Sequence, residues 1–486
     1  MVQGCSLNHF VRGRAIKQTH CEEVIFMYNE DTIAALSTPF GTGGIGVIRI
    51  SGEKAFDTVS DIFQGSKAIE NIKSHTVTYG KIVDQELKEV VDEVLLLKMC
   101  KPNTFTREDV IEIHCHGGIV IINRILELIF KNGVRPAEPG EFTKRAFLNG
   151  RIDLSQAEAI IDLINSKTVE SSKAAISHLE GRLSSRLKSI RETLVGLLAH
   201  IEVTVDYPEH DIEEITGENV LDNLINIKRE LLTLAGTFDR GKILREGLNI
   251  VIAGKPNVGK SSLLNQLSGS TKAIVTDIPG TTRDIIEEYV NINGIPAKIT
   301  DTAGIRNTED VVEKMGVNKA YEAIENADLT IAVLSAATGI QEEDAEILKL
   351  IKNKKSLVLI NKTDMVNNTR VNEIHQNLKE FNIIINASVI NSVGIEQLEA
   401  AISELFLQGR ISGNDEVLLT NSRHKCLVDQ AIEDIKQALA SFETGMPLDM
   451  VTIDIKSCAD NIGQITGESI DEAIMHDIFS RFCIGK

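Results

Sequence analysis

Residues 254–261 read GKPNVGKS, and this run decides how the surrounding chain folds. It follows an apolar, strand-like run at residues 249–253 and precedes a helical pattern at residues 262–267. A glycine-rich loop between a strand and a helix is the setting of a P-loop. Its backbone N–H groups wrap a β-phosphate, Lys260 neutralises charge on the β- and γ-phosphates, and the Ser261 hydroxyl can ligate Mg²⁺. The chain is expected to bind a nucleoside triphosphate.

Two further motifs identify the base of the nucleotide. The run DTAG at residues 301–304 and the run NKTD at residues 361–364 each follow a strand-like run. Ligands bind at this carboxyl end of the strands in open parallel sheets. The Asp364 carboxylate can accept hydrogen bonds from N1–H and the N2 amino group of guanine, which adenine does not offer. The expected nucleotide is therefore GTP.

The loop that contacts the base has two possible registers before Gly394. One is Ser388-Val389-Ile390, which has the better spacing, and the other is Asn386-Ala387-Ser388. Backbone N–H groups can contact guanine O6 in either register, so guanine specificity does not depend on the choice.

Hydrolysis requires a group that orients water and a group that neutralises transition-state charge. Ras-like switches place a glutamine directly after the switch glycine, but Gly304 is followed here by Ile305, which cannot orient water. Arg283 and Arg306 lie in the switch segments and read equally well as charge-neutralising groups or as solvated loop charges.

The rest of the chain extends outward from this nucleotide-binding core. With 486 residues, it is about three times the length of a typical ~150-residue domain. Residues 31–150 alternate short strand-like runs with helices and predict a small α+β domain. Residues 246–406 predict a doubly wound, Ras-like α/β domain. Residues 151–245 and 407–486 are helical and are expected to form one discontinuous domain into which the α/β domain is inserted.

Composition excludes several classes of protein. The apolar fraction is 42% and the charged fraction 25%, as in ordinary globular proteins. A net charge of -19 means that RNA must be bound through local basic patches or a basic partner. The apolar runs fall short of the ~20 residues that span a bilayer. Seven scattered cysteines without CxxC spacing fit a reducing compartment, so a cytoplasmic protein is expected.

The first thirty residues lack the apolar core of a secretory signal and are expected to form a disordered extension. The biological start could lie at Met27, or the segment could be a weak organelle presequence. In the run His114-Cys115-His116, strand alternation places both histidines on one face, but no second pair of ligands follows. A metal site there is the less favoured reading.

The switch region and the chain terminus resemble one family. Residues 273–284 read AIVTDIPGTTRD, which resembles switch I of the MnmE/TrmE tRNA-modification GTPases. The terminal run FCIGK at residues 482–486 resembles the C-(I/L/V)-G-K ending of that family. Residues 38–46, 106–109 and 139–153 look like its folate-binding region, so the resemblance covers nearly all of residues 31–486.

The resemblance implies that K⁺ takes the place of an arginine finger. Its ligands would be Asn257, Thr276, Ile278 and Thr281, partly through backbone oxygens, with Mg²⁺ held by Ser261 and Thr282. The resemblance also assigns Glu313 to orienting the hydrolytic water through a second water, although from the residue alone Glu313 reads as an exposed helix glutamate. With catalytic Lys260, the GTP-binding set comprises Asn257, Val258, Gly259, Lys260, Ser261, Ser262, Thr276, Asp277, Ile278, Pro279, Gly280, Thr281, Thr282, Asp301, Thr302, Ala303, Gly304, Asn361, Lys362, Asp364 and Ser388.

The resemblance further implies a one-carbon site and a reactive thiol. Arg49, Glu108, Arg151 and Lys486 match ligands of a tetrahydrofolate derivative, 5,10-methylene or 5-formyl. Basic residues suit its glutamate tail and a carboxylate suits the pterin, although Arg49 and Glu108 alone read as surface charges. Cys483 is a candidate catalytic thiol that acts covalently, activates a neighbour or packs.

The implied function is that of a K⁺-dependent GTPase in tRNA modification. As a homodimer, it would join the FAD-carrying flavoprotein MnmG (GidA) in a heterotetramer or larger complex. Together they would add an aminomethyl-type group, such as carboxymethylaminomethyl, to C5 of wobble uridine 34. The alternative is a regulatory or ribosome-assembly GTPase of the Era/Der type, which has no reason to end in the run around Cys483.

Overall fold

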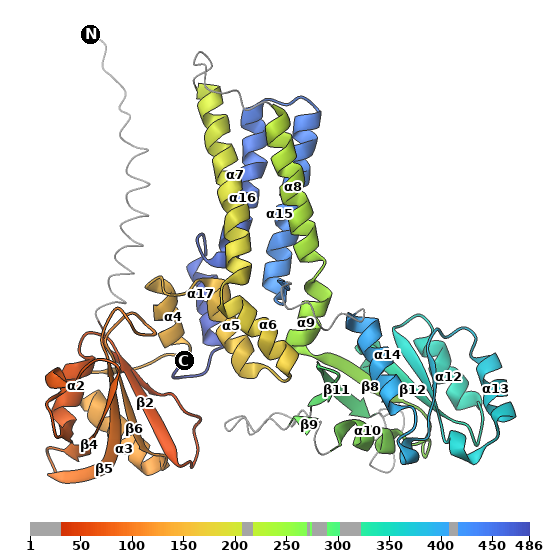
Figure 1. Ribbon diagram of the computed structural model, residues 1–486, viewed down its shortest axis with the longest axis horizontal. Helices are drawn as coiled ribbons and strands as arrows, with labels where there is room; N and C mark the ends of the chain where they lie inside the picture. Colours follow the sequence, from red (N-terminus) through yellow and green to blue (C-terminus); the bar gives the residue numbers. More distant parts are fainter. Residues whose placement is uncertain (1–30, 207–216, 270–272, 275–288, 302–321, 408–416) are drawn as a thin grey trace. The chain divides into compact units, whose positions relative to one another are not determined.

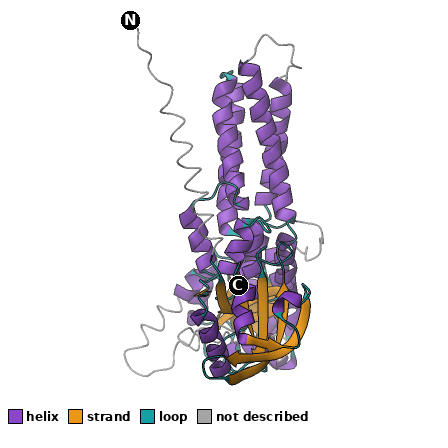
Figure 2. Cartoon of the chain, turned by 90° about the vertical axis from the view of Figure 1, so that its left-hand side faces the viewer, coloured by secondary structure: helices purple, strands orange, loops and turns teal. Residues whose placement is uncertain are grey.

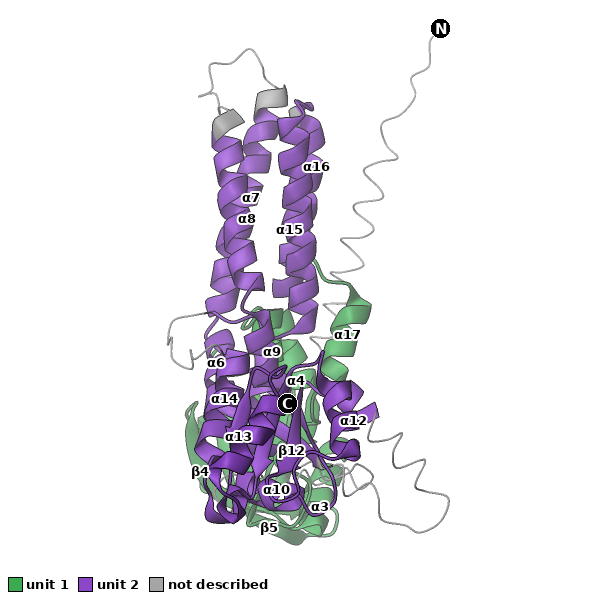
Figure 3. Cartoon of the chain, turned by 90° about the vertical axis from the view of Figure 1, so that its right-hand side faces the viewer, with its two compact units in different colours: residues 1–158, 278–282, 469–486 green, residues 159–277, 283–468 purple. Residues whose placement is uncertain are grey.

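The computed structural model describes residues 31–206, 217–269, 273–274, 289–301, 322–407 and 417–486. The expected extension at residues 1–30 lies outside this part of the chain. The described chain forms two compact units, one containing residues 31–158 and 469–486 and the other containing most of the remainder (Figure 3).

The first unit is built on a seven-stranded sheet in the order β3-β4-β5-β6-β2-β1-β7. Neighbouring strands are antiparallel except for the parallel pair of β1 and β7. The strands are β1 (Ile33–Leu36), β2 (Ile45–Ser51), β3 (Phe63–Gly65), β4 (Thr76–Asp84), β5 (Glu89–Met99), β6 (Val110–His116) and β7 (Arg135–Pro136).

Alternation along these strands gives the sheet two different faces. Ile48 and Ile113 are fully buried on the face that packs against helices α2 (Ala55–Ile62) and α3 (Ile119–Lys131). Their strand neighbours, Arg49 and Glu112, lie on the opposite face. There the buried Phe142 of α4 (Glu141–Leu148) packs with Ile33 of β1.

The last helix, α17 (Glu472–Ser480), groups with this sheet rather than with the other C-terminal helices. Its Phe479 ring lies 6.2 Å from the Phe147 ring of α4 and 5.5 Å from that of Phe482, measured between centroids. Burial of these aromatic rings explains the grouping. The domain limits at residues 150, 245 and 406 stay predictions.

The second unit contains a bundle of long helices from two distant stretches of sequence (Figure 1). Leu194, Leu231, Ile435 and Ile455 are fully buried in its core. Each long helix contributes one of these residues, so neither stretch could bury its apolar face alone. The long helices are α7 (Arg182–Asp206), α8 (Gly217–Ala235), α15 (Ser422–Glu443) and α16 (Leu448–Thr466). The shorter helices are α5 (Leu154–Asn165), whose first residues belong to the first unit, α6 (Val169–Leu179) and α9 (Phe238–Glu246).

The second unit also contains a seven-stranded sheet in the order β14-β13-β12-β8-β11-β10-β9, drawn in orange with the other strands in Figure 2. Strands β14, β13, β12, β8 and β11 are parallel, and β10 and β9 extend the sheet in antiparallel fashion. The strands are β8 (Leu248–Ala253), β9 (Ala273–Ile274), β10 (Tyr289–Ile292), β11 (Ile295–Asp301), β12 (Leu329–Ser335), β13 (Ser356–Asn361) and β14 (Ile384–Asn386).

Helices cover both faces of this sheet, as the doubly wound prediction requires. On β8, Ile250 joins a core with residues of α10 and α14, whereas Val251 joins a core with residues of α12 and α13. The helices are α10 (Lys260–Ser268), α12 (Glu342–Ile351), α13 (Asn368–Asn377) and α14 (Ile395–Leu407). The predicted multidomain α+β fold class with a P-loop α/β core is confirmed.

Within the described residues, no helix has both the length and the apolar character that a membrane crossing requires.

Candidate functional site

The loop at residues 254–259 joins strand β8 to helix α10, which begins at Lys260, and the loop is shaped by its glycines. Gly259 has φ +105°, and a Cβ on it would lie only 2.2 Å from the Asn361 Nδ2 atom. Both the backbone angle and the close approach require glycine here. The loop therefore leads directly into the first turn of α10, whose N–H groups suit an anion.

Lys260 lies across this loop. Its side chain is buried, and its Nζ atom donates to the carbonyl oxygens of Gly254 and Lys255, at 2.8 Å each. The Lys260 ammonium is thus held against the backbone of the loop that is predicted to bind the phosphates. Of the neighbouring predicted contacts, Val258 is buried and Ser262 is exposed.

The guanine motif follows β13, which is separated from β8 by β12 in the sheet, and its side chains bind the backbone of the P-loop. Asn361, at the end of β13, donates from Nδ2 to the Val258 carbonyl oxygen at 2.8 Å, and its Oδ1 accepts from the Val389 N–H at 3.0 Å. Lys362 Nζ donates to the Asn257 carbonyl oxygen at 2.7 Å. The structure therefore brings together three loops that are far apart in sequence.

Both candidate registers of the base-contacting loop are bonded to the guanine motif. Val389 is tied to Asn361, and the buried Ser388 accepts from Asn391 Nδ2 at 2.9 Å. Asn386 instead pairs with His375, Oδ1 to Nε2, at 2.9 Å. Ala387, in the other register, is also bonded to the guanine motif, because its carbonyl oxygen accepts from Thr363 Oγ1 at 2.9 Å. Both registers therefore lie beside the motif, and the preference for residues 388–390 stays a prediction. The Asp364 side chain of the motif is exposed.

Much of the predicted switch machinery lies outside the described residues. Asp301 is described only as the end of β11, paired with Ile252 of β8. Asn257 and Ser261 are the described members of the K⁺ and Mg²⁺ sets, and both are exposed. The residues outside are Thr276, Asp277, Ile278, Pro279, Gly280, Thr281, Thr282, Thr302, Ala303, Gly304 and Glu313.

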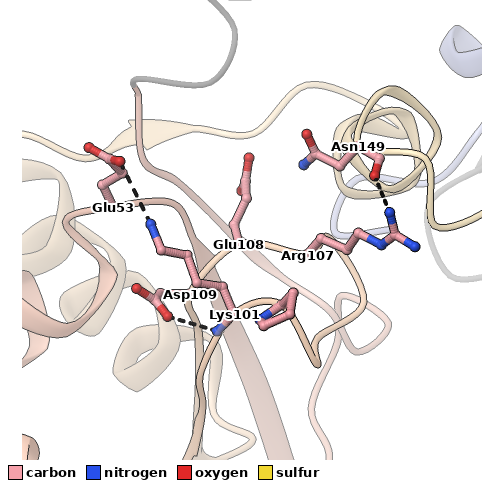
Figure 4. A pocket seen from close by; sticks show the side chains of 7 residues that line it. Glu53, Lys101, Arg107, Glu108, Asp109 and Asn149 are labelled. Carbon is pink, nitrogen blue, oxygen red and sulfur yellow. Dashed lines mark hydrogen bonds and ion pairs between the residues drawn. The ribbon is translucent and has the colours of Figure 1, made fainter.

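In the first unit, Glu108 is the predicted folate ligand that faces a pocket. Its side chain is only 12% exposed and accepts from Ser51 Oγ at 2.7 Å and from Arg145 Nη1 at 3.2 Å. Burial raises the pKa of this carboxyl, and Arg145 and Ser51 oppose the rise. The pocket of about 390 Å³ is lined by Glu53, Lys101, Pro102, Arg107, Glu108, Asp109 and Asn149 (Figure 4).

Arg145 is a residue that sequence reasoning missed. Its buried guanidinium pairs with Asp31, Glu108 and Glu141. Burial alone would raise the pKa values of Asp31 and Glu141, but their bonds to Arg135 and Arg145 outweigh it and lower them. Except for Glu141, these partners lie far from Arg145 along the chain, so no local pattern marks it.

The other arginines of the predicted folate set are held by neighbours. Arg49 donates from Nε to Glu112 at 2.9 Å. Arg151 donates from Nη1 to the Thr104 carbonyl oxygen, and Thr104 Oγ1 donates to the Glu108 carbonyl oxygen at 2.7 Å. Arg151 is thereby linked to Glu108 through one residue, although Glu108 alone of the four predicted ligands lines the pocket.

The C-terminal run is anchored on the first unit. The Gly485 carbonyl oxygen accepts from Ser37 Oγ at 3.1 Å, and the Cys483 carbonyl oxygen accepts from the Gly140 N–H at 3.4 Å. The Cys483 side chain is exposed, and the Lys486 N–H closes a turn onto the Cys483 carbonyl oxygen at 3.3 Å. These bonds place the terminal residues beside the end of β1.

The anchoring places Gly485, the residue before Lys486, against the end of β1, the strand that pairs with the Arg49 strand β2. Gly485 packs against the Leu36 carbonyl oxygen at the end of β1, and the preceding residue, Ala35, is paired with Arg49 of β2. The structure therefore gathers Arg49, Glu108, Arg151 and the terminal residues into one unit.

The two histidines of strand β6 have separate carboxylate partners. His114 Nε2 lies 3.4 Å from Glu112, and His116 Nδ1 lies 2.6 Å from Asp92. In the described part of the chain, no group of three or more His, Cys, Asp or Glu side chains is arranged to hold a metal ion.

Comparison with known proteins matches both parts of the chain. A family profile described as GTP-binding protein TrmE N-terminus matches residues 32–151, and one described as MnmE helical domain matches residues 154–483. The tRNA modification GTPase MnmE of Acetivibrio thermocellus is 63% identical over 460 residues, covering 95% of this chain and 100% of that protein. The protein of the same name from Alkaliphilus oremlandii is 50% identical over 465 residues, with the same coverage of both chains.

Among solved structures, a single-residue variant of Aquifex aeolicus Era bound to GDP.AlF4- is 29% identical, with a TM-score of 0.28. The match covers 38% of this chain and 66% of that chain.

Gly485→Ala is expected to release the C-terminal run. Gly485 has φ +89°, and an added Cβ would lie 2.1 Å from the Leu36 carbonyl oxygen. Strain and clash together cost about 1–3 kcal/mol. Hydrogen exchange at the Gly140 and Lys486 amides should accelerate about tenfold.

Gly445→Ala is the matched control. Gly445 also has a positive φ, +71°, but no atom lies within 4 Å of an added Cβ. Unchanged exchange at Gly140 in Gly485→Ala would show that the anchoring does not depend on this glycine.

Proposed function

The chain belongs to the MnmE family of tRNA modification GTPases, and from this premise we propose that its GTPase cycle is potassium-dependent and drives modification of wobble uridine 34. The product is an aminomethyl-type group, such as carboxymethylaminomethyl, at C5 of the base. The observation that carries the proposal is the anchoring of the Cys483 run beside β1, in the unit that holds the folate candidates. An Era/Der-type switch has no use for that arrangement.

Hydrolysis of GTP begins with binding at the P-loop. The loop N–H groups and Lys260 hold the phosphates, and Asp364 with the 388–390 turn selects guanine. Asn257 fits a K⁺ ligand because its exposed carboxamide offers an oxygen while its backbone oxygen is held by Lys362. Asn257 would help to hold K⁺, which would supply positive charge for the transition state, and Ser261 would be a ligand of Mg²⁺. Glu313 would orient the hydrolytic water.

The one-carbon donor is a tetrahydrofolate derivative held by the first unit. The partly buried Glu108 carboxylate, fixed by Ser51 and Arg145, fits the donor edge of a pterin. Arg49, Arg151 and Lys486 supply positive charge for the anionic tail of the folate. The folate would supply the one-carbon unit when bound, and Cys483 is the exposed cysteine of the anchored C-terminal run in the same unit.

The partners follow from charge and chemistry. With a net charge of -19, the chain leaves most contacts with tRNA to a partner. We assign that role to the flavoprotein MnmG, which carries FAD and joins a homodimer of this chain in a heterotetramer or larger complex. The site of action is the cytoplasm.

The potassium assignment predicts that GTP turnover is faster in K⁺ than in Na⁺. Asn257→Gly removes the carboxamide but keeps the backbone, because Asn257 has φ +61° and glycine adopts that angle freely. Turnover in K⁺ should fall at least about tenfold while affinity for GDP changes by less than about threefold. Turnover that is equally fast in both salts would refute the role of the ion.

The thiol assignment predicts that Cys483→Ser abolishes wobble-uridine modification while GTP turnover stays within about twofold of the unmodified protein. Mass spectrometry of tRNA hydrolysates from cells carrying the variant measures the modification. Cys426→Ser, which changes another exposed cysteine, is the control. Survival of the modification in Cys483→Ser would exclude the thiol.

An apolar patch on the first sheet supports the homodimer. Val77 and Tyr79 of β4 and Leu95 of β5 point away from the α2–α3 core and are 57%, 58% and 45% exposed. Tyr79 is paired directly with Leu95 in the sheet, so the three side chains are neighbours on one face. A contiguous apolar face of this kind suits a second copy of the chain.

Val77→Lys is expected to convert the dimer into a 53.3 kDa monomer, because it places a charge inside the proposed interface. Light scattering after size-exclusion chromatography measures the mass. The control is Val120→Lys on α3, which is exposed on the helix that covers the other face. A dimer that persists in Val77→Lys contradicts this interface.

A further inference from the structure

Lys255, the second residue of the P-loop, makes a buried ion pair that the GTP-binding set does not include. Its side chain is 8% exposed, and its Nζ atom lies 2.6 Å from the Asp344 Oδ2 atom of α12. The same ammonium donates to the Gln341 Oε1 atom at 2.7 Å. Lys255 therefore turns away from the nucleotide side of the loop toward the first turn of α12.

The acceptor is part of the N-terminal cap of α12. Asp344 is fully buried, and its Oδ2 also accepts from the Gln341 N–H at 3.0 Å. A carboxylate in the first turn of a helix is favoured by the helix dipole. Because the cap fixes both acceptors relative to the helix, the position of the Lys255 ammonium is fixed as well.

The rest of the loop is held from elsewhere. Asn361 and Lys362 bind the carbonyl oxygens of Val258 and Asn257, so they fix the second half of the loop. The first half contains Lys255, whose carbonyl oxygen accepts from Lys260 Nζ at 2.8 Å. A shift of Lys255 would thus move an acceptor of the phosphate-binding lysine.

A stability role alone explains this pair poorly. Burying two charges costs desolvation, so a buried ion pair adds little stability compared with apolar side chains of the same size. Its geometry, however, is specific, because both acceptors converge on one ammonium. The Lys255–Asp344 pair is therefore expected to affect the position of the P-loop more than the stability of the fold.

We propose that Lys255 is a positioning residue. Its contacts with Asp344 and Gln341 attach the first half of the P-loop to α12, so that this half keeps its phosphate-binding shape. It acts through the loop backbone and does not touch the nucleotide. GTP and GDP both carry the β-phosphate, so the contacts of Lys255 with Asp344 and Gln341 strengthen the binding of both nucleotides. Uniform binding of this kind lowers KM and leaves kcat unchanged.

The test uses the full-length variants Lys255→Met and Asp344→Asn. The Kd and dissociation rate of a fluorescent GDP analogue, together with KM and kcat for GTP, should separate binding from turnover. Kd and KM are expected to rise about tenfold, with kcat per nucleotide-binding site within about twofold. Lys255→Arg, which keeps the charge and the donors, should restore Kd to within about threefold.

Lys352→Met is the matched control. Lys352 follows the end of the same helix, α12, and makes an exposed ion pair with Glu380 at 2.9 Å, so its loss should leave Kd unchanged. A folded Lys255→Met protein with Kd within about twofold of the unmodified protein, or with reduced kcat at unchanged Kd, overturns the proposal.

Gln341→Ala covers the case in which the charge variants do not fold. It removes the neutral acceptor and leaves the ion pair intact, so no buried charge loses its partner. Kd should rise about threefold, and an unchanged Kd overturns the proposal.

Discussion

The nucleotide site depends on the two hydrogen bonds that the Asn361 side chain makes. A single carboxamide donates to the Val258 carbonyl oxygen and accepts from the Val389 N–H, so it joins the phosphate loop to the base-contacting turn. Both bonds are buried, where an unmatched polar group would be costly. The amide side chain meets both demands because it carries a donor and an acceptor on one planar group.

The parallel sheet makes this bridge possible. Strands β8 and β13 flank β12 and run in the same direction, so their loops emerge at one edge of the sheet. Gly259 leaves the space that the Asn361 amide fills. The parallel strands, Gly259 and the Asn361 amide therefore act together to hold the second half of the loop. The ion pair between Lys255 and Asp344 of α12 attaches the first half of the loop.

In the first unit, hydrogen bonds from distant residues hold the C-terminal run in place. Four terminal residues have too few contacts to order themselves. Here the Gly140 N–H and the Ser37 hydroxyl bind the backbone of the run, whose first residue, Phe482, packs against Phe479. The anchoring keeps Cys483 in the same unit as Glu108, which is the arrangement that the proposed function requires.

The P-loop and the guanine motif could be predicted from the sequence alone, because each is a short run of neighbouring residues. The alternation of strand-like and helical runs was enough to predict the doubly wound sheet. Local spacing also predicted the two helical stretches that pack together, since each has an apolar face that needs a partner. Three features emerge from the three-dimensional structure: the grouping of α17 with the first sheet, the bond from Val389 to Asn361, and the buried ion pairs of Arg145 and Lys255. These outcomes depend on contacts between distant residues, such as Ser37 with Gly485 or Lys255 with Asp344, and no periodicity along the chain records such pairings.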